Sequence, residues 1–320
     1  MQNYAFIINP HSAGGKTKKK WDSLLEPALK AKNVDYKVFF TERREHAIQL
    51  ARDAAQSGGF KNVVSVGGDG TFHEVVNGVL DKNGKLVKPG TNVGVICSGT
   101  GSDFIKTIGI PQDPLAAIDL ALKGNVRTID VLKGTFQSVD GQQMSKFSIN
   151  VADAGVGGDV VALVNRSRKI FGGKVTFQLA ILRTFLSYKL KPVRVELDSE
   201  TPRDIELVSI FFGNCIYNGG GLKAAYKAVP DDGLMDVFII HGIKQKNVLA
   251  ANMKELYKDD AAIEALMKKF PSNMSYGRYK KAKLIPAGTK DVMLDFDGEM
   301  VGKGPLDIEI IPSAVNVLAP

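Results

Sequence analysis

Apolar residues in the first 130 positions follow two alternating patterns. Short β-branched runs, typical of buried strands, occur at residues 4–9, 36–41, 62–67, 92–97 and 127–132. Between them lie stretches with apolar residues at helical spacing, at residues 18–32, 45–56, 72–80 and 114–124. Strict alternation of strands and helices predicts a parallel sheet covered by helices on both faces. In such sheets, ligands bind beyond the carboxyl ends of the strands.

The pattern changes after Leu132. Strand-like runs separated by turn residues occur at residues 146–152, 192–198, 204–216, 235–243, 281–287, 290–298 and 305–311. They favour a mainly antiparallel β-sandwich, interrupted by helical stretches at 173–190 and 245–270. We therefore expect an α/β domain at residues 1–132 and a β-rich domain at residues 133–304. The C-terminal segment, about 305–320, could return to the first domain.

Residues 63–80, VVSVGGDGTFHEVVNGVL, begin as a strand, break at glycines around Asp69 and continue as a helix. Glycines let the backbone approach a ligand, and the first amides of a helix attract anions, so a phosphate fits at this turn. Asp69 beside a phosphate indicates either a divalent cation between them or an anchor for a neighbouring loop. Thr71 and Glu74 have the spacing of a capping box, so both could instead serve only the helix start.

Two further glycine loops follow predicted strands, NPHSAGGKT at residues 9–17 and SGTGSDF at residues 98–104. The first ends like a Walker A loop, but Pro10 occupies the leading glycine position, so we reject a P-loop. GGDGT and SGTGSDF do not complete the G-x-G-x-x-G pattern of a dinucleotide site. Lys16, Ser12 and the glycine amides can still bind a phosphate. Because the three loops follow strands of one predicted sheet, together they predict a triphosphate site.

Composition limits the choice of partners. The chain has 320 residues, 44% of them hydrophobic, with a formal charge of +8 and a pI near 9.2, which favours nucleotides, nucleic acid or anionic lipid as partners. It contains no recognition helix or paired strand aromatics typical of nucleic-acid modules. We find no signal peptide or membrane span and expect a cytoplasmic protein. Cys97 and Cys215 fit reduced core thiols, and the four histidines have no metal-binding spacing.

The order of motifs along nearly the whole chain resembles that of diacylglycerol kinase catalytic domains. The matching segments are GGDGT followed by HEVVNG, GTGSDF, IDV, NVADAGVGGDV, GGGLKAAYKAVPDDGLMDV and DFDGE. GGDG alone is shared with NAD kinases and phosphofructokinases, whereas DDGLMDV and DGE favour the lipid branch. The resemblance is to soluble bacterial lipid kinases related to sphingosine and ceramide kinases. It implies ATP-dependent phosphorylation of a hydroxyl of diacylglycerol or a related lipid, an NAD kinase/phosphofructokinase-like nucleotide domain and a β-sandwich lipid-substrate domain.

The resemblance also implies which residues contact the nucleotide. ATP would lie against Asn9, Pro10, His11, Ser12, Ala13, Gly14, Lys16, Thr41, Gly67, Gly68, Asp69, Gly70, Thr71, Phe72, His73, Glu74 and Thr100. Asp69, Asp103 and Asp130 match family aspartates that form a polar network near the phosphates and Mg²⁺.

Five residues of the second domain and its turns match positions with other roles in the family. Asp297 is the implied general base toward the lipid hydroxyl, with Glu299 as its partner or as an alternative proton acceptor. A structural cation would bind Asp232 and the carbonyls of Val229 and Leu234. Phosphoryl transfer depends mainly on positioning and charge neutralisation, and a carboxylate within hydrogen-bond reach can accept the hydroxyl proton. The alternative for both acidic segments is a plain turn between two strands.

Several positions depart from the family pattern. Ser102 and Lys106 replace the usual asparagine and arginine of one glycine loop, Tyr226 replaces a proline, and Cys97 replaces another. Lysine keeps the charge of arginine but loses its planar fork. These departures concern the acceptor lipid more than the nucleotide.

Residues 171–192 combine many apolar residues with flanking cations. This stretch could line an acyl-chain pocket or rest on an anionic surface, making the protein peripheral at the inner membrane face, or it could be an ordinary packed helix. Edge strands of the second domain could pair in a homodimer. Two other functions stay open, phosphorylation of a soluble acceptor such as NAD and nucleotide- or lipid-dependent regulation without turnover.

Overall fold

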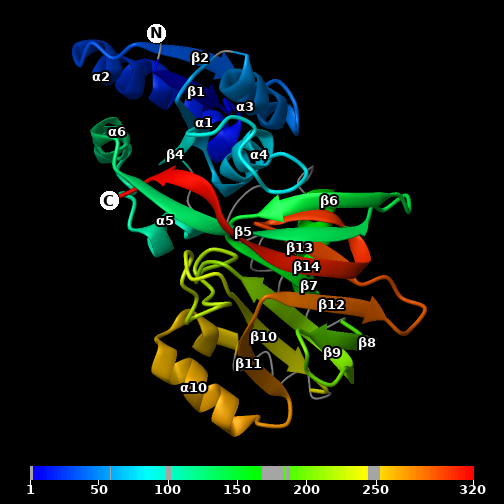
Figure 1. The fold of residues 1–320 in the computed structure, drawn as a ribbon. Helices are drawn as coiled ribbons and strands as arrows, with labels where there is room; N and C mark the ends of the chain where they lie inside the picture. The colour runs from blue at the N-terminus through cyan, green and yellow to red at the C-terminus, as the bar shows by residue number, and fades with distance from the viewer. Residues whose placement is uncertain (1–2, 58, 99–101, 168–183, 185–187, 244–252) are drawn as a thin grey trace. The chain divides into compact units, whose positions relative to one another are not determined.

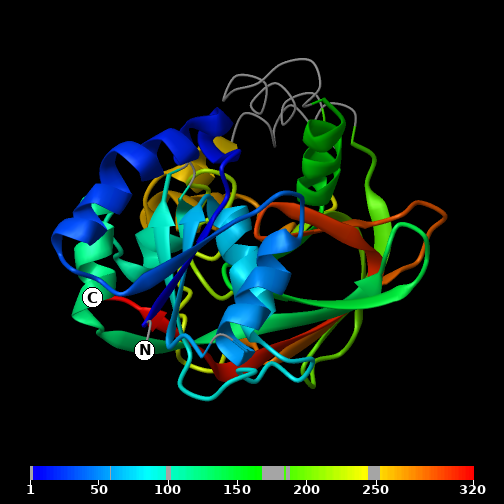
Figure 2. The same cartoon turned by 90° about the horizontal axis from the view of Figure 1, so that it is seen from above.

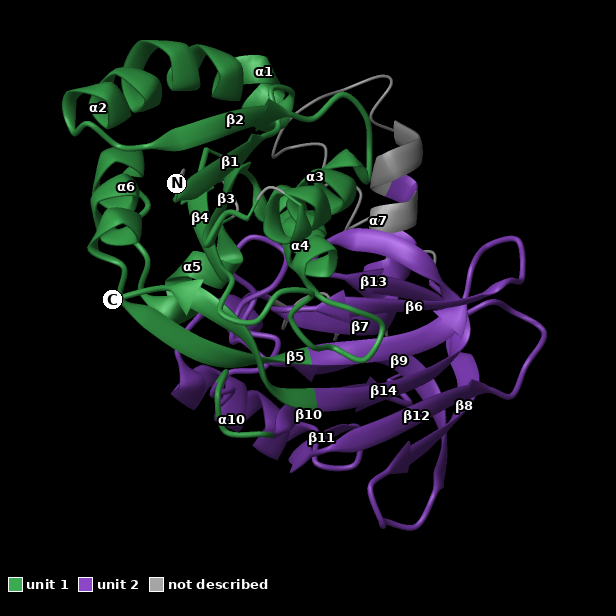
Figure 3. Ribbon diagram, turned by 45° about the horizontal axis from the view of Figure 1, so that its top comes forward, with its two compact units in different colours: residues 1–131, 230–233, 311–320 green, residues 132–229, 234–310 purple. Residues whose placement is uncertain are grey.

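The computed structural model of the chain describes residues 3–57, 59–98, 102–167, 184, 188–243 and 253–320 (Figure 1). Two compact units are built from interleaved segments (Figure 3). Unit 1 contains Met1–Val131, Pro230–Gly233 and Ile311–Pro320, and unit 2 contains Leu132–Val229 and Leu234–Ile310. The second unit is therefore not a continuous stretch after residue 132, since Pro230–Gly233 packs with the first.

Unit 1 is built on a sheet with the strand order β2-β1-β3-β4, followed by the C-terminal part of β14. The strands are β1 (Tyr4–Ile8), β2 (Tyr36–Phe40), β3 (Asn62–Gly67), β4 (Asn92–Cys97) and β14 (Glu299–Leu318). Each neighbouring pair is parallel, with Phe6 opposite both Val38 and Val64, and Asn92 opposite both Asn62 and Asn316. All residues of β3 and β4 are buried, as expected of central strands covered on both faces.

Helices lie along both faces of this sheet (Figure 2). They are α1 (Ser12–Lys20), the π-helical turn η1 (Trp21–Leu25), α2 (Glu26–Ala31), α3 (His46–Gln56), α4 (Asp69–Val79), α5 (Asp103–Ile108) and α6 (Pro114–Lys123). The Trp21 ring packs against Phe6, with 5.4 Å between ring centroids. Helices α3 and α4 touch at Gly78, where an added Cβ would collide with the Ile48 carbonyl.

The strand predicted at residues 127–132 belongs to this sheet but is not a neighbour of β4. It lies in β5 (Val126–Gln137), which pairs with β14 and, from Leu132 onward, antiparallel with β6 (Gln143–Ser148). The place beside β4 is taken by β14, where Val317 lies opposite Val93. Hydrophobic spacing identifies a strand but not its neighbour, so a run near the C-terminus can fill an edge that sequence order assigns to another strand.

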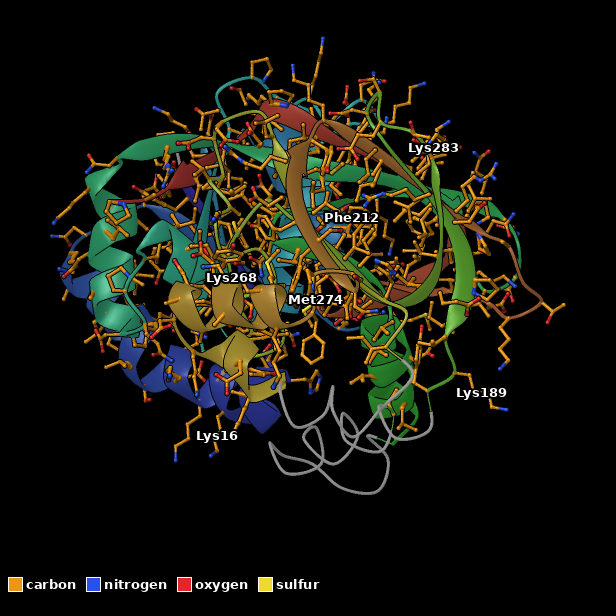
Figure 4. All side chains as sticks on the ribbon, turned by 90° about the horizontal axis from the view of Figure 1, so that it is seen from below. Lys16, Lys189, Phe212, Lys268, Met274 and Lys283 are labelled. Carbon is orange, nitrogen blue, oxygen red and sulfur yellow. The ribbon has the colours of Figure 1, made fainter. Side chains whose placement is uncertain are left out.

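Unit 2 is mainly antiparallel. Its strand order is β11-β10-β9-β7-β13-β14, with β12 paired to β14 and β8, and β8 paired to β9. The strands are β7 (Val151–Gly155), β8 (Lys191–Leu197), β9 (Arg203–Gly213), β10 (Met235–His241), β11 (Met274–Tyr279), β12 (Lys281–Pro286) and β13 (Met293–Phe296). Phe212, Leu294 and Phe296 belong to its central hydrophobic core. Figure 4 shows Phe212 lying among the packed side chains of this unit.

A second hydrophobic cluster lies under the helices of unit 2. These are α7 (Val156–Ser167), the short 3₁₀ helix η2 (Met253–Tyr257) and α10 (Asp260–Lys269). Val160, Leu256 and Ile263 pack there with Phe238 and Met274 of the sheet. The helix expected at 173–190 and the start of the one expected at 245–270 lie largely outside the described residues. Strand β11 was not predicted, because Met-Ser-Tyr-Gly-Arg-Tyr has few β-branched residues and an internal glycine.

Among the residues that the structure describes, no helix is both long and apolar enough to cross a membrane.

Candidate functional site

The loop after β1 combines a polar anchor with an unusual backbone. Asn9 accepts a hydrogen bond from the His11 amide (3.0 Å) through Oδ1, and its Nδ2 donates to Thr71 Oγ1 (3.3 Å). Ala13, Gly14 and Gly15 then have φ values of 54°, 68° and 85°, so three consecutive residues are left-handed at the start of α1. The Gly15 amide donates to the His11 carbonyl (3.1 Å), and a glycine turn of this kind lets a ligand approach the backbone closely.

Other residues predicted to contact the nucleotide lie in this loop or beside it. Lys16 is exposed and extends away from α1 (Figure 4). Pro10 and His11 form the turn itself, and the buried Thr41 donates its amide to the Ile8 carbonyl (2.9 Å). Thr41 therefore lies at the carboxyl edge of the sheet, next to the end of β1.

The GGDGT turn is closed by tight packing. An added Cβ at Gly67 would overlap Thr71 Oγ1 and approach Ser12 Oγ to 3.2 Å, so only glycine fits. Gly68, in contrast, has no atom within 4 Å of its Cβ position, which leaves its backbone open to a ligand. Helix α4 begins directly after Gly68, with Asp69 in its first turn. An anion can therefore approach both the glycine backbone and the positive end of the helix.

Glu74 does not complete a capping box on α4. Its carboxylate accepts the amides of Glu45 (2.9 Å) and Ala47 (3.0 Å) and so caps the start of α3. The side chains of Phe72 and His73 are also turned inward, Phe72 against Phe104 with 4.6 Å between ring centroids. Residues 72–74 thus support the turn, Phe72 and His73 by packing and Glu74 by joining α4 to α3.

The loop after β4 is tied to the GGDGT turn. Asp69 Oδ2 accepts the Asp103 amide (3.2 Å), and Lys106 forms an ion pair with Asp103 at 2.7 Å. The Ser102 backbone is left-handed, with φ 50°, while Thr100 lies outside the described residues. Asp103 is itself buried, so its carboxylate is held in place by its surroundings.

The hydroxyl groups of Thr17 and Ser98 also link these segments. The sequence did not predict this role for either residue. Thr17 Oγ1 and Ser98 Oγ are 2.6 Å apart, and the Ser98 amide donates to the Gly67 carbonyl (2.8 Å). No spacing rule signals a contact between residues so far apart in the chain. Beside them, burial and the charge of Asp69 raise the pKa of Cys97 to about 12, so this thiol stays protonated and unreactive. The three loops therefore converge at one edge of the sheet, as the strand order predicts.

Asp130 has a different environment from Asp69 and Asp103. Its buried carboxylate accepts the amides of Gly233 and Ser313, each at 2.7 Å. It thereby fastens the two returning segments of unit 1 to β5. Close by in the chain, Arg127 binds Asp231 through two hydrogen bonds of 2.8 and 2.9 Å.

The segment predicted to hold a structural cation is at the surface. Asp232 is exposed and Val229 is 42% exposed, while Leu234 is half-buried. The described residues contain no cluster of three or more acidic, histidine or cysteine side chains arranged for a metal. A site built from one carboxylate and two carbonyls stays a prediction.

Asp297 lies in a left-handed turn after β13, with φ 55°. Its buried carboxylate accepts the Ser148 hydroxyl (2.6 Å) and the amides of Ile149 (3.0 Å), Asn150 (2.9 Å) and Val151 (3.2 Å). The residue therefore joins its turn to the start of β7. Glu299, two residues on, is half-buried.

Two family models match the chain, one in each half. The model for the diacylglycerol kinase catalytic domain matches residues 3–134, and that for the YegS C-terminal NAD kinase beta sandwich-like domain matches residues 150–319. Sphingoid long chain base kinase 4 of Schizosaccharomyces pombe is 25% identical over 100% of this chain and 75% of its own length. The diacylglycerol kinase of Staphylococcus saprophyticus is 26% identical over 98% of this chain and 94% of its own length.

Solved structures share the fold. One from Bacillus anthracis str. Sterne has a TM-score of 0.75 at 23% identity and covers 100% of this chain and 95% of its own. Another from that organism, named a diacylglycerol kinase, has a TM-score of 0.69 at 19% identity, with coverage of 100% and 97%. The motifs, both domain matches and the fold agree, and the chain belongs to the diacylglycerol kinase catalytic-domain family of lipid kinases.

Proposed function

We propose that this protein transfers the γ-phosphoryl group of ATP to a hydroxyl of diacylglycerol or a closely related lipid. Family membership supports a phosphotransferase acting on an alcohol group. ATP binding is supported by the convergence of three loops, which the Asn9–Thr71 and Asp103–Asp69 hydrogen bonds join. Open glycine backbone, left-handed amides and a helix start are the groups that phosphates require.

Mg²⁺ fits the donors on these loops. Asp69 and Asp103 supply carboxylate oxygens, the ligands that this hard cation prefers, and their hydrogen bond keeps the two segments together. When bound with ATP, the cation would neutralise charge on the phosphates. Lys16 would add a mobile positive charge from α1. Asp130 would act indirectly in this scheme, by fastening the returning segments through the Gly233 and Ser313 amides.

The acceptor hydroxyl must lose a proton during transfer. We assign this role to the turn Asp297–Glu299, called the catalytic turn below. Asp297 has a fixed orientation because four donors hold its carboxylate. Glu299 is the alternative acceptor on the same turn, with a half-buried side chain that is less enclosed than that of Asp297.

The test is a kinase assay with labelled ATP and a panel of lipids in mixed micelles, with NAD as a soluble alternative acceptor. Asp297→Asn and Glu299→Gln are compared with Asp291→Asn, a control at an exposed carboxylate paired with Lys303. We expect diacylglycerol or a related lipid to be labelled, and the control to match the wild type. Labelling of NAD without any lipid, or tight ATP binding without transfer to any acceptor, would contradict the proposal.

Three finer proposals concern membrane binding, a homodimer and a structural cation at Asp232. A formal charge of +8 supports peripheral binding to an anionic membrane surface at the cytoplasmic face, since each nearby cation adds about 1 kcal/mol. Lys189 is exposed and extends outward (Figure 4). Cosedimentation with anionic vesicles at low and high salt tests this surface. Sedimentation velocity tests a homodimer, and metal analysis of protein dialysed against Mg²⁺ or Ca²⁺ tests the Asp232 cation site.

A further inference from the structure

Two aspartates that the proposed reaction leaves unused face each other beneath the catalytic turn. Strands β7 and β13 are antiparallel neighbours, and their register places Asp153 directly opposite Asp295. Opposite residues of such a pair have Cβ atoms about 5 Å apart and project to the same face of the sheet. Leu294 and Phe296, on either side of Asp295, belong to the central core, so the two carboxyl groups lie on the other face. Their exposed fractions are only 2% and 1%.

Each carboxyl group has one oxygen with a donor and one without. Asp295 Oδ1 accepts the Gly298 amide (2.7 Å), and Asp153 Oδ2 accepts Asn218 Nδ2 (3.1 Å). Among the described residues, Asp295 Oδ2 and Asp153 Oδ1 are buried without a hydrogen-bond donor. Two ionised carboxylates can only accept, so they cannot satisfy one another. A single proton between them would satisfy both oxygens.

Asn218 and the start of α7 both favour the negative charge on Asp153. An added Cβ at Gly157 would collide with the Asp153 carboxylate, so this helix start lies directly against it. Burial raises the pKa of Asp153 to about 7, while Asn218 and the Gly158 amide act in the opposite direction by stabilising its charged form. Burial and the nearby charge of Asp153 raise the pKa of Asp295 well above its ordinary value. Because Asn218 and the Gly158 amide both donate toward Asp153, the proton is favoured on Asp295.

We infer that Asp153 and Asp295 hold one proton between them and that this acid pair positions the catalytic turn through the Asp295–Gly298 hydrogen bond. The positioning role rests on the proposed function, whereas the shared proton does not. The physical cause is that two buried like charges at this separation cannot both ionise without strong repulsion. A neutral Asp295 removes that repulsion while its Oδ1 keeps the Gly298 amide in place.

The surrounding charges set the direction of the pH response. Asp159 of α7 and the turn carboxylates Asp297 and Glu299 raise the pKa of one member or the other, and Lys191 neutralises Asp159 with contacts of 3.0 and 2.9 Å. Because the folded-state pKa values are raised, the stabilisation is complete below about pH 4, the ordinary aspartate pKa, and is lost as pH rises through about 7 and beyond. Alkaline pH should therefore loosen the turn.

Two substitutions separate the proton from the turn contact. In Asp295→Asn, the amide oxygen keeps the Gly298 bond and Nδ2 replaces the shared proton. Asp295→Ala removes both, and Asp291→Asn is the exposed control. Three properties are measured from pH 5.5 to 9: lipid kinase rates, melting temperature, and hydrogen exchange of the Gly298 and 149–151 amides. Infrared spectra of wild type and Asp295→Asn detect the carbonyl band of a protonated buried carboxyl group.

We expect Asp295→Asn to keep neutral-pH kcat within about threefold of wild type, while its melting temperature and rate no longer decline toward alkaline pH. Asp295→Ala should lower kcat by about tenfold or more, with an unchanged KM for ATP and faster exchange of the Gly298 and 149–151 amides.

An alkaline decline in Asp295→Asn equal to that of wild type, or no protonated carboxyl band lost in that variant, would overturn the shared proton. Wild-type exchange at Gly298 and 149–151 in Asp295→Ala would overturn the positioning role. If wild type labels no lipid, the proposed function fails. The exchange, melting and infrared measurements then still decide the acid pair and its hold on the turn.

Discussion

Replacing Asp297 by asparagine should lower the stability of the fold as well as the kinase rate. Four donors among the described residues reach the carboxylate, three of them at Oδ1 and one at Oδ2. An asparagine oxygen placed at the Oδ1 position keeps the Ser148, Asn150 and Val151 donors. Its NH₂ group then faces the Ile149 amide, donor against donor. A purely catalytic residue would show no such conflict.

The magnitude follows from the lost contact. One charge-assisted bond disappears and one buried N–H is left without an acceptor, which costs about 2 kcal/mol. Asp297→Ala leaves all four donors without their acceptor and should cost about 4 kcal/mol or more. For a unit of this size, 1 kcal/mol lowers Tm by about 2–4 °C, so we expect losses of about 6 °C and 12 °C.

The assay is thermal unfolding followed by far-UV circular dichroism, with hydrogen exchange at Ile149 to locate the effect. Asp291→Asn, at a carboxylate with 61% side-chain exposure, should melt like wild type. ATP affinity measured by calorimetry should stay unchanged in Asp297→Asn, because the phosphate loops belong to unit 1. An inactive Asp297→Asn that melts at the wild-type temperature, with unchanged Ile149 exchange, would refute the anchoring role and leave proton transfer as its only function.

Three further predictions concern unit 1. Gly68→Ala should leave Tm unchanged, because its Cβ meets no protein atom, but should weaken ATP binding about tenfold by calorimetry, because that Cβ would face a phosphate. Gly67→Ala should weaken ATP binding and also lower Tm, because its Cβ collides with Thr71. Glu74→Ala should cost about 1 kcal/mol in urea unfolding, since the start of α3 loses its acceptor. Asp130→Ala should cost about 3 kcal/mol and speed exchange of the two amides it holds; unchanged exchange would contradict its fastening role.

Local sequence patterns predicted much of the fold. The β-branched runs of β1–β4 are confined to strands in the structure, and the glycine turns between strand and helix lie where the loops converge. Both follow from effects that act within a few residues, namely side-chain spacing and the backbone freedom of glycine. The neighbours of a strand are not set locally: β14 fills the place beside β4, and β5, which contains the 127–132 run, pairs with β14 and, from Leu132 onward, with β6.

The roles of the acidic residues depended even more on the tertiary structure. Sequence identified Glu74, Asp130 and Asp297 as polar positions in recognisable motifs, but their hydrogen bonds reach residues between 27 and 183 positions away. Each carboxylate holds backbone amides of a segment that no local rule connects to it. The meeting of Asp153 and Asp295 is of the same kind, since only the β7–β13 register brings them together.

The sequence by itself determined most of the element types, the positions of the glycine loops and the family, because periodicity, glycine positions and motif order are local properties of the chain. The tertiary structure alone decided which strands pair, which carboxylates anchor distant segments, and that Asp153 and Asp295 lie buried opposite each other. Those properties arise from long-range pairing and from burial, where a charge is costly unless a donor or a proton accompanies it.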